Sequence, residues 1–324
     1  MSGAEQLASV MEAGGPALAE QLQRTEVRLA EVAESRGREL GAHATGTLTA
    51  GGKRLRPMLV FLCGGEGEGL LAAGAAVELL HMATLVHDDV LDQAPLRRGV
   101  PTVFATGGRE AATATGDLLF SRAFAELAAT GSEDAVAALS AASSALARGE
   151  LMQRADAWSD GVTTARYLER CELKTASLFA AACRLGALLG DSPAACESLE
   201  AFGRRIGLAF QILDDVLDVS GPAERTGKHR GTDLLDGTVT LPLIVAWERD
   251  AELAGMDLRE LVSEPAQAEA VCDRIAKTGA LGECRERALR HVAEAKAALT
   301  GAELPPERRH ALDLVADGVV ERYA

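Results

Sequence analysis

The five residues Asp-Asp-Val-Leu-Asp occur twice in the sequence, at 88–92 and again at 214–218. On a helix, positions three and four apart share a face, so each copy would gather its carboxylates into one acidic patch. Both copies follow an apolar run and precede a stop signal, Pro95 in one case and Gly221-Pro222 in the other. They are therefore predicted in the last turns of two helices, where the helix dipole disfavours carboxylates.

Either copy alone could be a solvated acidic helix end. Two copies, each emerging from an apolar helix, favour a different role, because a divalent cation held between them would relieve both the repulsion and the conflict with the dipole. Oxygen-only ligands suit Mg²⁺, which keeps waters and takes substrate phosphates as further ligands. A calcium loop of the EF-hand type is not indicated, since its alternating acidic ligands, central glycine and closing glutamate are missing.

Basic residues lie beside both clusters, although the chain carries a net charge of -15. That charge argues against a nucleic-acid partner. Each basic group, taken singly, could lie on a solvated face of a helix. Beside a bound metal, the basic groups indicate a diphosphate site with two kinds of cation, the metal ion and the basic side chains. The basic residues are Lys53, Arg54, Arg56, Arg97, Arg98, Lys228, His229 and Arg230.

The elements that must position these residues are predicted to be helices. The chain has 324 residues, 48% of them hydrophobic, and only 10 prolines, a composition that favours an all-α protein with one sizeable core and no interdomain linker. Apolar spacing predicts an amphipathic helix over 16–42 and a helix buried on all faces over 69–91. The polar segment from 222 to 242 is too long for a simple turn and is predicted to be functional.

The six cysteines form no CxxC pair and are predicted to be buried free thiols, as suits a reducing cytoplasm. The N-terminus lacks the basic start and apolar core of a signal peptide. The longest apolar segments are interpreted as too short to cross a bilayer. We therefore expect a soluble cytoplasmic protein with no transmembrane segment.

Seven segments occur in an informative order: GGKRLRP (51–57), LLHMATLVHDDVLDQAPLRRG (79–99), GDLLFSRAF (116–124), GELMQ (149–153), KTA (174–176), FQILDDVLD (210–218) and GKHRGTDLLDGTVTLPLI (227–244). On these motifs the chain resembles the trans-isoprenyl diphosphate synthases, also called polyprenyl synthetases, over roughly residues 45–245. The resemblance implies one all-α domain over 1–324, a helical bundle around a deep central cavity, usually as a homodimer. It also implies Mg²⁺-dependent, head-to-tail, trans condensation of an allylic diphosphate with isopentenyl diphosphate.

The resemblance further assigns roles to individual residues. About three Mg²⁺ ions per site are expected on the aspartates. The metal-binding residues are Asp88, Asp89, Asp92, Asp214, Asp215 and Asp218. The catalytic residues are Asp88, Asp89, Asp92, Asp214, Asp215 and Lys174. Allylic diphosphate is expected to bind Arg97, Lys174, Thr175, Gln211 and Lys228. Isopentenyl diphosphate is expected to bind Lys53, Arg56, His81 and Arg98.

Product length is expected to depend on residues below the first cluster. Ala83 and Thr84 are not aromatic, which in this family favours a polyprenyl product of twenty carbons or more; a shorter geranylgeranyl or farnesyl product is the alternative. Helix geometry places Thr84 directly beneath Asp88 but turns Ala83 aside. Phe120 and Phe124 are candidates for a deeper floor, with ordinary core packing as the other interpretation.

Two competing functions and two single residues remain open. A class I terpene cyclase would usually carry a different second metal motif and more aromatic residues than the 3% found here. A non-catalytic subunit of a heteromeric synthase would typically lack the aspartates. His87 is interpreted as a core residue with a satisfied hydrogen bond. Thr238 stands where many relatives place a lysine, which puts one diphosphate contact in doubt.

Overall fold

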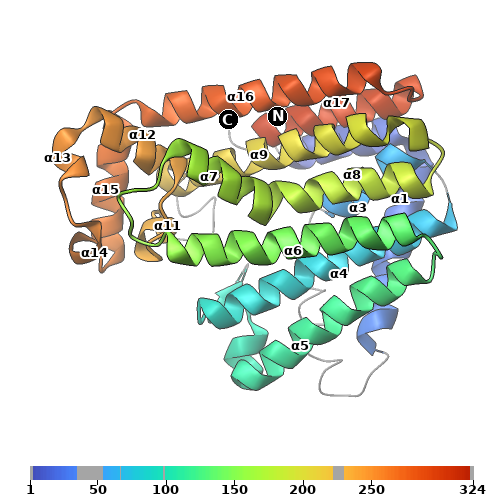
Figure 1. The fold of residues 1–324 in the computed structure, drawn as a ribbon, viewed down its shortest axis with the longest axis horizontal. Coiled ribbons are helices and arrows are strands. Elements are labelled where there is room, and N and C mark those ends of the chain that lie inside the picture. The colour runs from blue at the N-terminus through green and yellow to red at the C-terminus, as the bar shows by residue number, and fades with distance from the viewer. Residues whose placement is uncertain (1–2, 35–53, 66, 98, 222–229, 322–324) are drawn as a thin grey trace.

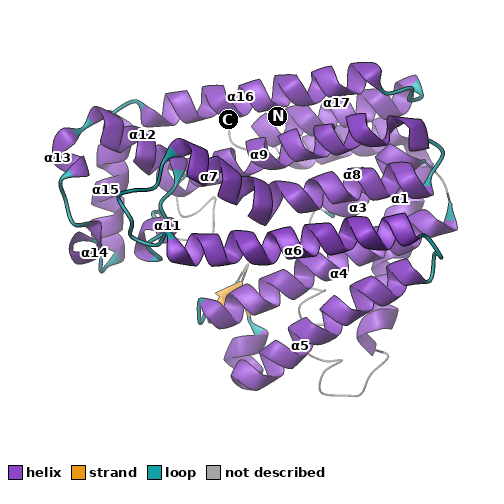
Figure 2. Cartoon of the chain, viewed as in Figure 1, coloured by secondary structure: helices purple, strands orange, loops and turns teal. Residues whose placement is uncertain are grey.

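The structure, a computed structural model, describes residues 3–34, 54–65, 67–97, 99–221 and 230–321. Helices make up nearly all of it, as the composition predicts (Figures 1 and 2). The α-helices are α1 Gly3–Glu34, α3 Leu55–Gly64, α4 Glu68–Leu91, α5 Val103–Ala128, α6 Glu133–Ala155, α7 Thr164–Cys171, α8 Ser177–Leu189, α9 Cys196–Ser220, α11 Thr232–Leu235, α12 Leu241–Arg249, α13 Ala251–Ala254, α14 Leu258–Leu261, α15 Pro265–Lys277, α16 Ala280–Ala298 and α17 Pro306–Glu321. A π-helix, η1, spans Glu172–Ala176, and two 3₁₀ turns, η2 and η3, span Pro193–Ala195 and Leu299–Gly301.

The strands described in the structure form one small antiparallel hairpin after α4, β1 Leu96–Arg97 with β2 Val100–Pro101. Leu96 pairs with Pro101, and Arg97 pairs with Val100. This hairpin matters for the site because it carries Arg97 back toward the end of α4 (Figure 2).

Helix α4 is the central helix, as its apolar sequence predicts. It packs against α3, α5 and α8, and residues such as Ala76, Leu79 and Ala83 are fully buried. By length and composition, Gly69–Leu91 could cross a membrane, so the expectation that every apolar segment is too short was wrong. In the fold, however, 67% of its most apolar window is buried inside the protein, which is the behaviour of a core helix.

Two long helices end at the same side of the bundle. Helix α9 packs between α8 and α16, and α6 packs against α8. The carboxyl-terminal ends of α4 and α9, which carry the two aspartate clusters, both point toward the left in Figure 1. The fold therefore brings together two segments that are 126 residues apart, counted from Asp88 to Asp214.

The first helix begins earlier than its amphipathic pattern predicts. α1 runs from Gly3 to Glu34 and is kinked at Gly15, where φ is 74° just before Pro16. The remainder of the expected 16–42 helix, from 35 onward, lies outside the described residues. α1 packs against α17, so the two terminal helices close the back of the bundle together.

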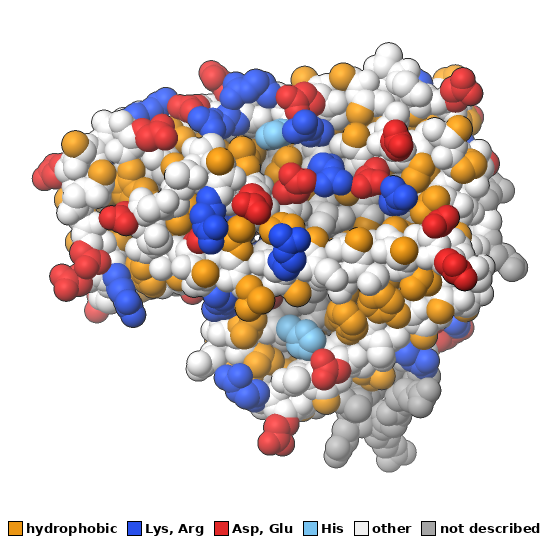
Figure 3. Space-filling model, in the orientation of Figure 1, with side chains coloured by type: hydrophobic (Ala, Val, Ile, Leu, Met, Phe, Trp, Pro, Cys, Tyr) orange, Lys and Arg blue, Asp and Glu red, His pale blue; other side chains and the backbone are white. Residues whose placement is uncertain are grey.

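All six cysteines are free, and five of them are buried, which confirms the predicted thiols. On the face shown in Figure 3, acidic and basic side chains alternate over α8, α9 and α16. Ion pairs such as Arg184–Glu200 and Arg204–Glu172, both 2.6 Å, account for this mixture. This face therefore lacks the basic patch that a nucleic-acid partner would need.

Candidate active site

The first aspartate cluster lies at the end of α4, as predicted. The Asp92 N–H donates to the Asp88 carbonyl (2.8 Å), which closes the helix, and Asp92 is its C-cap. The Asp89 carboxylate is 5% exposed and accepts a charged contact from Arg97 on β1 (2.8 Å). The hairpin thus folds back to neutralise one carboxylate of the cluster. Among the described residues, Arg97 forms its ion pair with Asp89.

Asp88 has an electrostatically unfavourable environment for a carboxylate. Burial raises its pKa to about 6; Lys174 and Arg97 oppose the rise, while Glu150 and Asp92 reinforce it. A carboxylate in this position gains from any cation that reaches it. A bound cation near Asp88 would therefore lower this pKa and favour the charged carboxylate.

Two residues that the sequence analysis did not assign connect the cluster to α6. Arg154 donates to Asp92 (2.5 Å) and to Glu150 (2.9 Å). Glu150 also forms an ion pair with Lys174. Burial acts to raise the pKa of Glu150, but Lys174 and Arg154 outweigh it and hold the pKa below its usual range. Glu150 and Arg154 lie one helical turn apart, and this spacing could have predicted from the sequence that the two side chains form an ion pair.

The second cluster, at the end of α9, centres on a buried carboxyl group. Asp215 is 3% exposed, and it accepts hydrogen bonds from the Tyr167 hydroxyl (2.6 Å) and the Gln211 amide (2.8 Å). Burial raises the pKa of Asp215 to about 8, and the nearby carboxylate of Asp233 adds to the rise. Tyr167 comes from α7, and nothing in its sequence context indicated this contact.

The outer aspartates of this cluster have different surroundings. Asp214 is exposed. Asp218 accepts hydrogen bonds from the backbone N–H groups of Thr232 (3.2 Å) and Asp233 (3.3 Å), at the start of α11. The polar segment after α9 was predicted to be functional, and its described part holds Asp218 in place.

The π-helix η1 connects the two clusters. Lys174 faces Glu150 and Asp88, while the next residue, Thr175, donates to Gln211 (2.6 Å), which in turn holds Asp215. Thr175, Gln211 and Lys174 were predicted as one binding group, and the fold brings them together. π-helical turns of this kind are frequent at functional sites.

Two glycines allow the close packing of η1. A Cβ on Gly149 of α6 would lie 2.6 Å from the Lys174 backbone nitrogen. A Cβ on Gly207 of α9 would lie 2.5 Å from the Ala176 Cα. Because backbone atoms cannot yield as a flexible side chain can, only glycine fits at either position. The glycine of the GELMQ motif is thus explained by the position of Lys174.

The predicted isopentenyl diphosphate residues are described only in part. The Arg56 guanidinium lies 4.6 Å from the centre of the Phe179 ring, and His81 is half-buried on α4. Lys53, Arg98 and Lys228 lie outside the described residues. Arg54, in contrast, is 8% exposed and pairs with Glu26 and Glu78, which makes it a structural residue between helices.

The four product-length candidates occupy different environments. Ala83 is fully buried, whereas Thr84 is half-buried and its hydroxyl donates to the His81 carbonyl (2.7 Å). The Phe120 and Phe124 rings on α5 lie 5.2 Å apart, but Phe120 is 37% exposed while Phe124 packs against the core. Of the two rings, Phe124 is therefore the better placed for an internal floor.

His87 does not lie in the core, contrary to expectation. Its side chain is 37% exposed, and its Nε2 lies 3.3 Å from Asp117 of α5. A Cβ on Gly116 would lie 2.2 Å from that nitrogen, so the glycine makes room for the ring. The face of α4 that carries His87 is covered only partly by α5, which periodicity could not reveal.

The donor chemistry of the two clusters fits a hard divalent cation such as Mg²⁺. All the candidate ligands are carboxylates; Asp215 is buried, Asp88 is half-buried, and both have raised pKa values. Among the described residues, no three His, Cys, Asp or Glu side chains converge closely enough to hold a metal by themselves. Water and substrate phosphate would have to complete the coordination, as is usual for Mg²⁺.

Comparison with known proteins agrees with this arrangement. The sequence model of the family described as polyprenyl synthetase matches residues 38–278. The chain is 39% identical to heptaprenyl diphosphate synthase component 2 of Geobacillus stearothermophilus, over 82% of this chain and 84% of that one. It is 36% identical to geranylgeranyl diphosphate synthase of Methanosarcina mazei, over 84% and 86%.

A solved structure gives the same result for the fold. Polyprenyl synthase from Caulobacter crescentus, complexed with calcium and isoprenyl diphosphate, superposes with a TM-score of 0.85 at 34% identity, over 99% of this chain and 98% of that one. The fold and the paired clusters define an all-helical isoprenoid synthase. The chain belongs to the polyprenyl synthetase family, and it is a prenyltransferase of the polyprenyl diphosphate synthase type.

Proposed function

We propose that the protein condenses an allylic diphosphate with isopentenyl diphosphate, head-to-tail and trans, in a Mg²⁺-dependent reaction. The observation that carries the proposal is the pair of desolvated carboxyl groups, Asp88 and Asp215, joined through Lys174 and Thr175 of η1. Such a pair favours bound cations, and Mg²⁺ beside lysine and arginine side chains is a combination well suited to binding a diphosphate.

The aspartates have the role of holding metal, with Asp88, Asp92 and Asp214 as the principal ligands and Asp89, Asp215 and Asp218 in support. Bound Mg²⁺ supplies charge stabilisation for the departing diphosphate. Burial of Asp215 and partial burial of Asp88 reduce the contact of these carboxylates with water, which strengthens their interaction with charge.

The basic and polar residues orient the allylic diphosphate. Lys174 neutralises its oxygens from η1, and the Thr175–Gln211 pair fixes the neighbouring turn. Arg97 and Lys228 complete this group. Preorganised cations at the leaving group lower the barrier for breaking the allylic C–O bond, which leaves a delocalised carbocation.

Isopentenyl diphosphate is held beside this centre by Lys53, Arg56, His81 and Arg98. Its double bond attacks the allylic carbon, one C–C bond forms, and the released diphosphate accepts the proton that is lost. The reaction needs no protein nucleophile. Positioning of the two substrates is the contribution of these residues.

We propose a product of twenty carbons or more, because the positions before the first cluster carry Ala83 and Thr84 and no aromatic ring. The relatives include both a heptaprenyl and a geranylgeranyl diphosphate synthase, so membership of the family leaves the length open. A product that stops at geranylgeranyl, the lower end of this range, or at farnesyl, below it, is the alternative to a longer chain.

We also propose a cytoplasmic homodimer. Phe120 and Leu151 are exposed on α5 and α6, at 37% and 71%, and apolar side chains gather between these helices in Figure 3. Apolar surface of this kind is typical of an interface. The name component 2 of one relative makes a heteromer the alternative, and light scattering of the purified chain distinguishes the two.

The reaction is tested by supplying isopentenyl diphosphate with dimethylallyl, geranyl, farnesyl or geranylgeranyl diphosphate and Mg²⁺, and weighing the products by mass spectrometry. The expected result is a linear diphosphate extended by five-carbon units, abolished by chelation of Mg²⁺. Release of a cyclic hydrocarbon would indicate a terpene cyclase. A chain inactive with every primer would contradict the proposal.

A further inference from the structure

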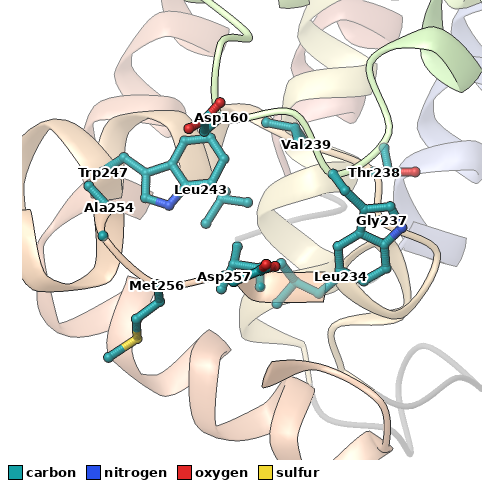
Figure 4. A pocket seen from close by; sticks show the side chains of 13 residues that line it. Asp160, Leu234, Gly237, Thr238, Val239, Leu243, Trp247, Ala254, Met256 and Asp257 are labelled. Carbon is teal, nitrogen blue, oxygen red and sulfur yellow. The ribbon is translucent and has the colours of Figure 1, made fainter. Parts of the chain in front are cut away.

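A pocket lies at the end of the molecule formed by α11, α12 and the turn between α13 and α14 (Figures 1 and 4). It holds about 430 Å³, which is within the range of small-molecule sites. No aspartate of the two clusters lines it. The pocket is therefore separate from the two aspartate clusters, although Thr238, at the position where many relatives place a lysine, lies in its lining. The proposed reaction assigns the pocket no role.

The wall between the two sites is the segment 232–239. On one side of this wall, the backbone N–H groups of Thr232 and Asp233 hold the Asp218 carboxylate. Farther along the same segment, Leu234, Gly237 and Val239 line the pocket. The separation is fixed by hydrogen bonds, since the Thr238 N–H donates to the Asp233 carbonyl (2.7 Å).

The charge of the pocket has one sign. Among its lining residues, the ionisable ones are Asp160 and Asp257, and none is basic. Asp257 uses Oδ1 to cap α14, accepting from the N–H groups of Arg259 (3.0 Å) and Glu260 (3.4 Å). In Figure 4 its carboxylate is directed across the pocket toward Leu234, and Asp160 lies at the rim. A diphosphate would be repelled here, while a cation would be attracted.

The rest of the lining is aromatic and aliphatic. Trp247 and Leu243 lie on one side, with Leu234 and Gly237 on the other (Figure 4). Trp158 covers Gly237 so closely that a Cβ there would lie 2.3 Å from the indole ring. Tryptophan faces attract organic cations more strongly than other aromatic rings do.

One polar group in the wall has no protein partner. The indole Nε1 of Trp247 is buried and has no hydrogen-bond acceptor among the described residues. Buried indole N–H groups usually find a partner. A ligand that brings an acceptor oxygen would supply the missing partner.

We propose that this pocket binds a small organic ammonium compound with an apolar body and an ether or carbonyl oxygen. Asp257 and Asp160 attract the ammonium group, and the rings of Trp158 and Trp247 surround the apolar body. The Trp247 indole N–H donates to the oxygen. The site is distinct from the one that takes diphosphates.

The chain offers a direct test, because it has two tryptophans and both line the pocket. Its intrinsic fluorescence therefore reports on the site without any label. The full chain is titrated at neutral pH and low salt with three probes of one shape: 2-phenoxyethylammonium, neutral 2-phenoxyethanol and anionic phenoxyacetate. We expect a saturable change with the ammonium, binding about fivefold weaker for the alcohol, and none for the carboxylate.

Asp257→Asn is the informative variant, because asparagine caps a helix as well as aspartate does and only the charge is lost. We expect it to weaken ammonium binding about threefold and to leave binding of the alcohol unchanged. Glu303→Gln, which removes an exposed carboxylate beyond the far end of α16, is the matched control and should change neither. If Asp257→Asn melts earlier than the parent chain, exposed Asp160→Asn provides the same comparison.

Trp247→Phe removes the indole N–H and leaves Trp158 as the reporter. We expect weaker binding of the ammonium and of the alcohol, and an unchanged preference for the ammonium. Equal affinity for all three probes would overturn the proposal. So would the absence of a saturable signal, or an equal loss of binding in Glu303→Gln. None of these measurements depends on prenyltransferase activity.

Discussion

The hydroxyl of Tyr167 donates a hydrogen bond of 2.6 Å to Oδ2 of Asp215, and both groups are buried. Burial alone would leave the Asp215 carboxyl mostly protonated near neutral pH, and this hydrogen bond favours its charged form. A residue of α7 therefore favours the charged form of a carboxylate on α9, although the two are distant in the sequence.

Tyr167→Phe should weaken Mg²⁺ binding. Without the hydroxyl, the pKa of Asp215 rises further, and at neutral pH less of the metal-binding form is present. We expect the dissociation constant for Mg²⁺ to rise roughly tenfold and the free energy of unfolding to fall by about 1 kcal/mol. Calorimetric Mg²⁺ titration with thermal melting measures both. Unchanged Mg²⁺ affinity would show that Tyr167 serves only the packing.

The raised pKa of Asp215, about 8, predicts how stability depends on pH in the metal-free protein. The native state binds this proton more tightly than the unfolded chain, whose aspartates titrate near pH 4 (~3.9). Its contribution to the free energy of unfolding is therefore most favourable at low pH and is lost as pH rises from about 4 to 8. Asp215→Asn mimics the protonated form and removes this loss.

The measurement compares melting temperatures of the parent chain and Asp215→Asn in a chelator at about pH 5 and about pH 9. We expect the parent to lose more stability than the variant between the two values, because their other groups are the same. Adding Mg²⁺ should restore the parent at the higher pH and leave the variant unaffected. Parallel curves would contradict the buried, protonated state of Asp215.

Arg154 forms an ion pair with Asp92, so a metal ion must compete with it for that carboxylate. Arg154→Leu should leave Asp92 available and bind Mg²⁺ about threefold more tightly. Its matched control is Arg148→Leu, an exposed arginine on the same helix. Calorimetry gives both affinities; an equal gain in the control would reflect net charge alone.

Gly149→Ala tests the position of η1. Its new Cβ would lie 2.6 Å from the Lys174 backbone nitrogen, so α6 and η1 must separate. We expect the free energy of unfolding to fall by about 1–3 kcal/mol. We also expect kcat/KM for the allylic substrate to fall. Gly282→Ala, in open space on α16, is the control and should be neutral or stabilising. Similar losses in both variants would contradict the close contact.

The sequence predicted the parts of the fold that follow from local pattern. Composition predicted the helices, and the apolar stretch at 69–91 predicted the core helix α4. The two clusters were expected at helix ends because proline and glycine follow them. Partners from distant segments were missed: Tyr167 and Arg154 reach the aspartates only after α6, α7 and α9 pack together. His87 was misplaced for the same reason, since its exposure depends on how far α5 covers α4.

The size of the residue at position 84 should affect product length. Thr84 lies one helical turn before Asp88 and is half-buried, so a larger side chain there would obstruct a growing prenyl chain beneath the cluster. We expect Thr84→Phe to shorten the product by one or more five-carbon units, while Thr84→Ser leaves the length unchanged. Ala83 is fully buried in the helix packing, so enlarging it would test stability instead.

The two phenylalanines of α5 separate a floor residue from an exposed one. Phe124 packs against the core, whereas Phe120 is 37% exposed, although their rings touch. If Phe124 limits chain growth, Phe124→Ala should lengthen the product, because truncation opens space inside the bundle. Phe120→Ala, which removes the same atoms at the surface, should leave it unchanged. Mass spectrometry of the products decides between them. If only Phe120→Ala lengthened the product, chain growth would be limited at the exposed face of α5. A second subunit would then cover the space that holds the growing chain.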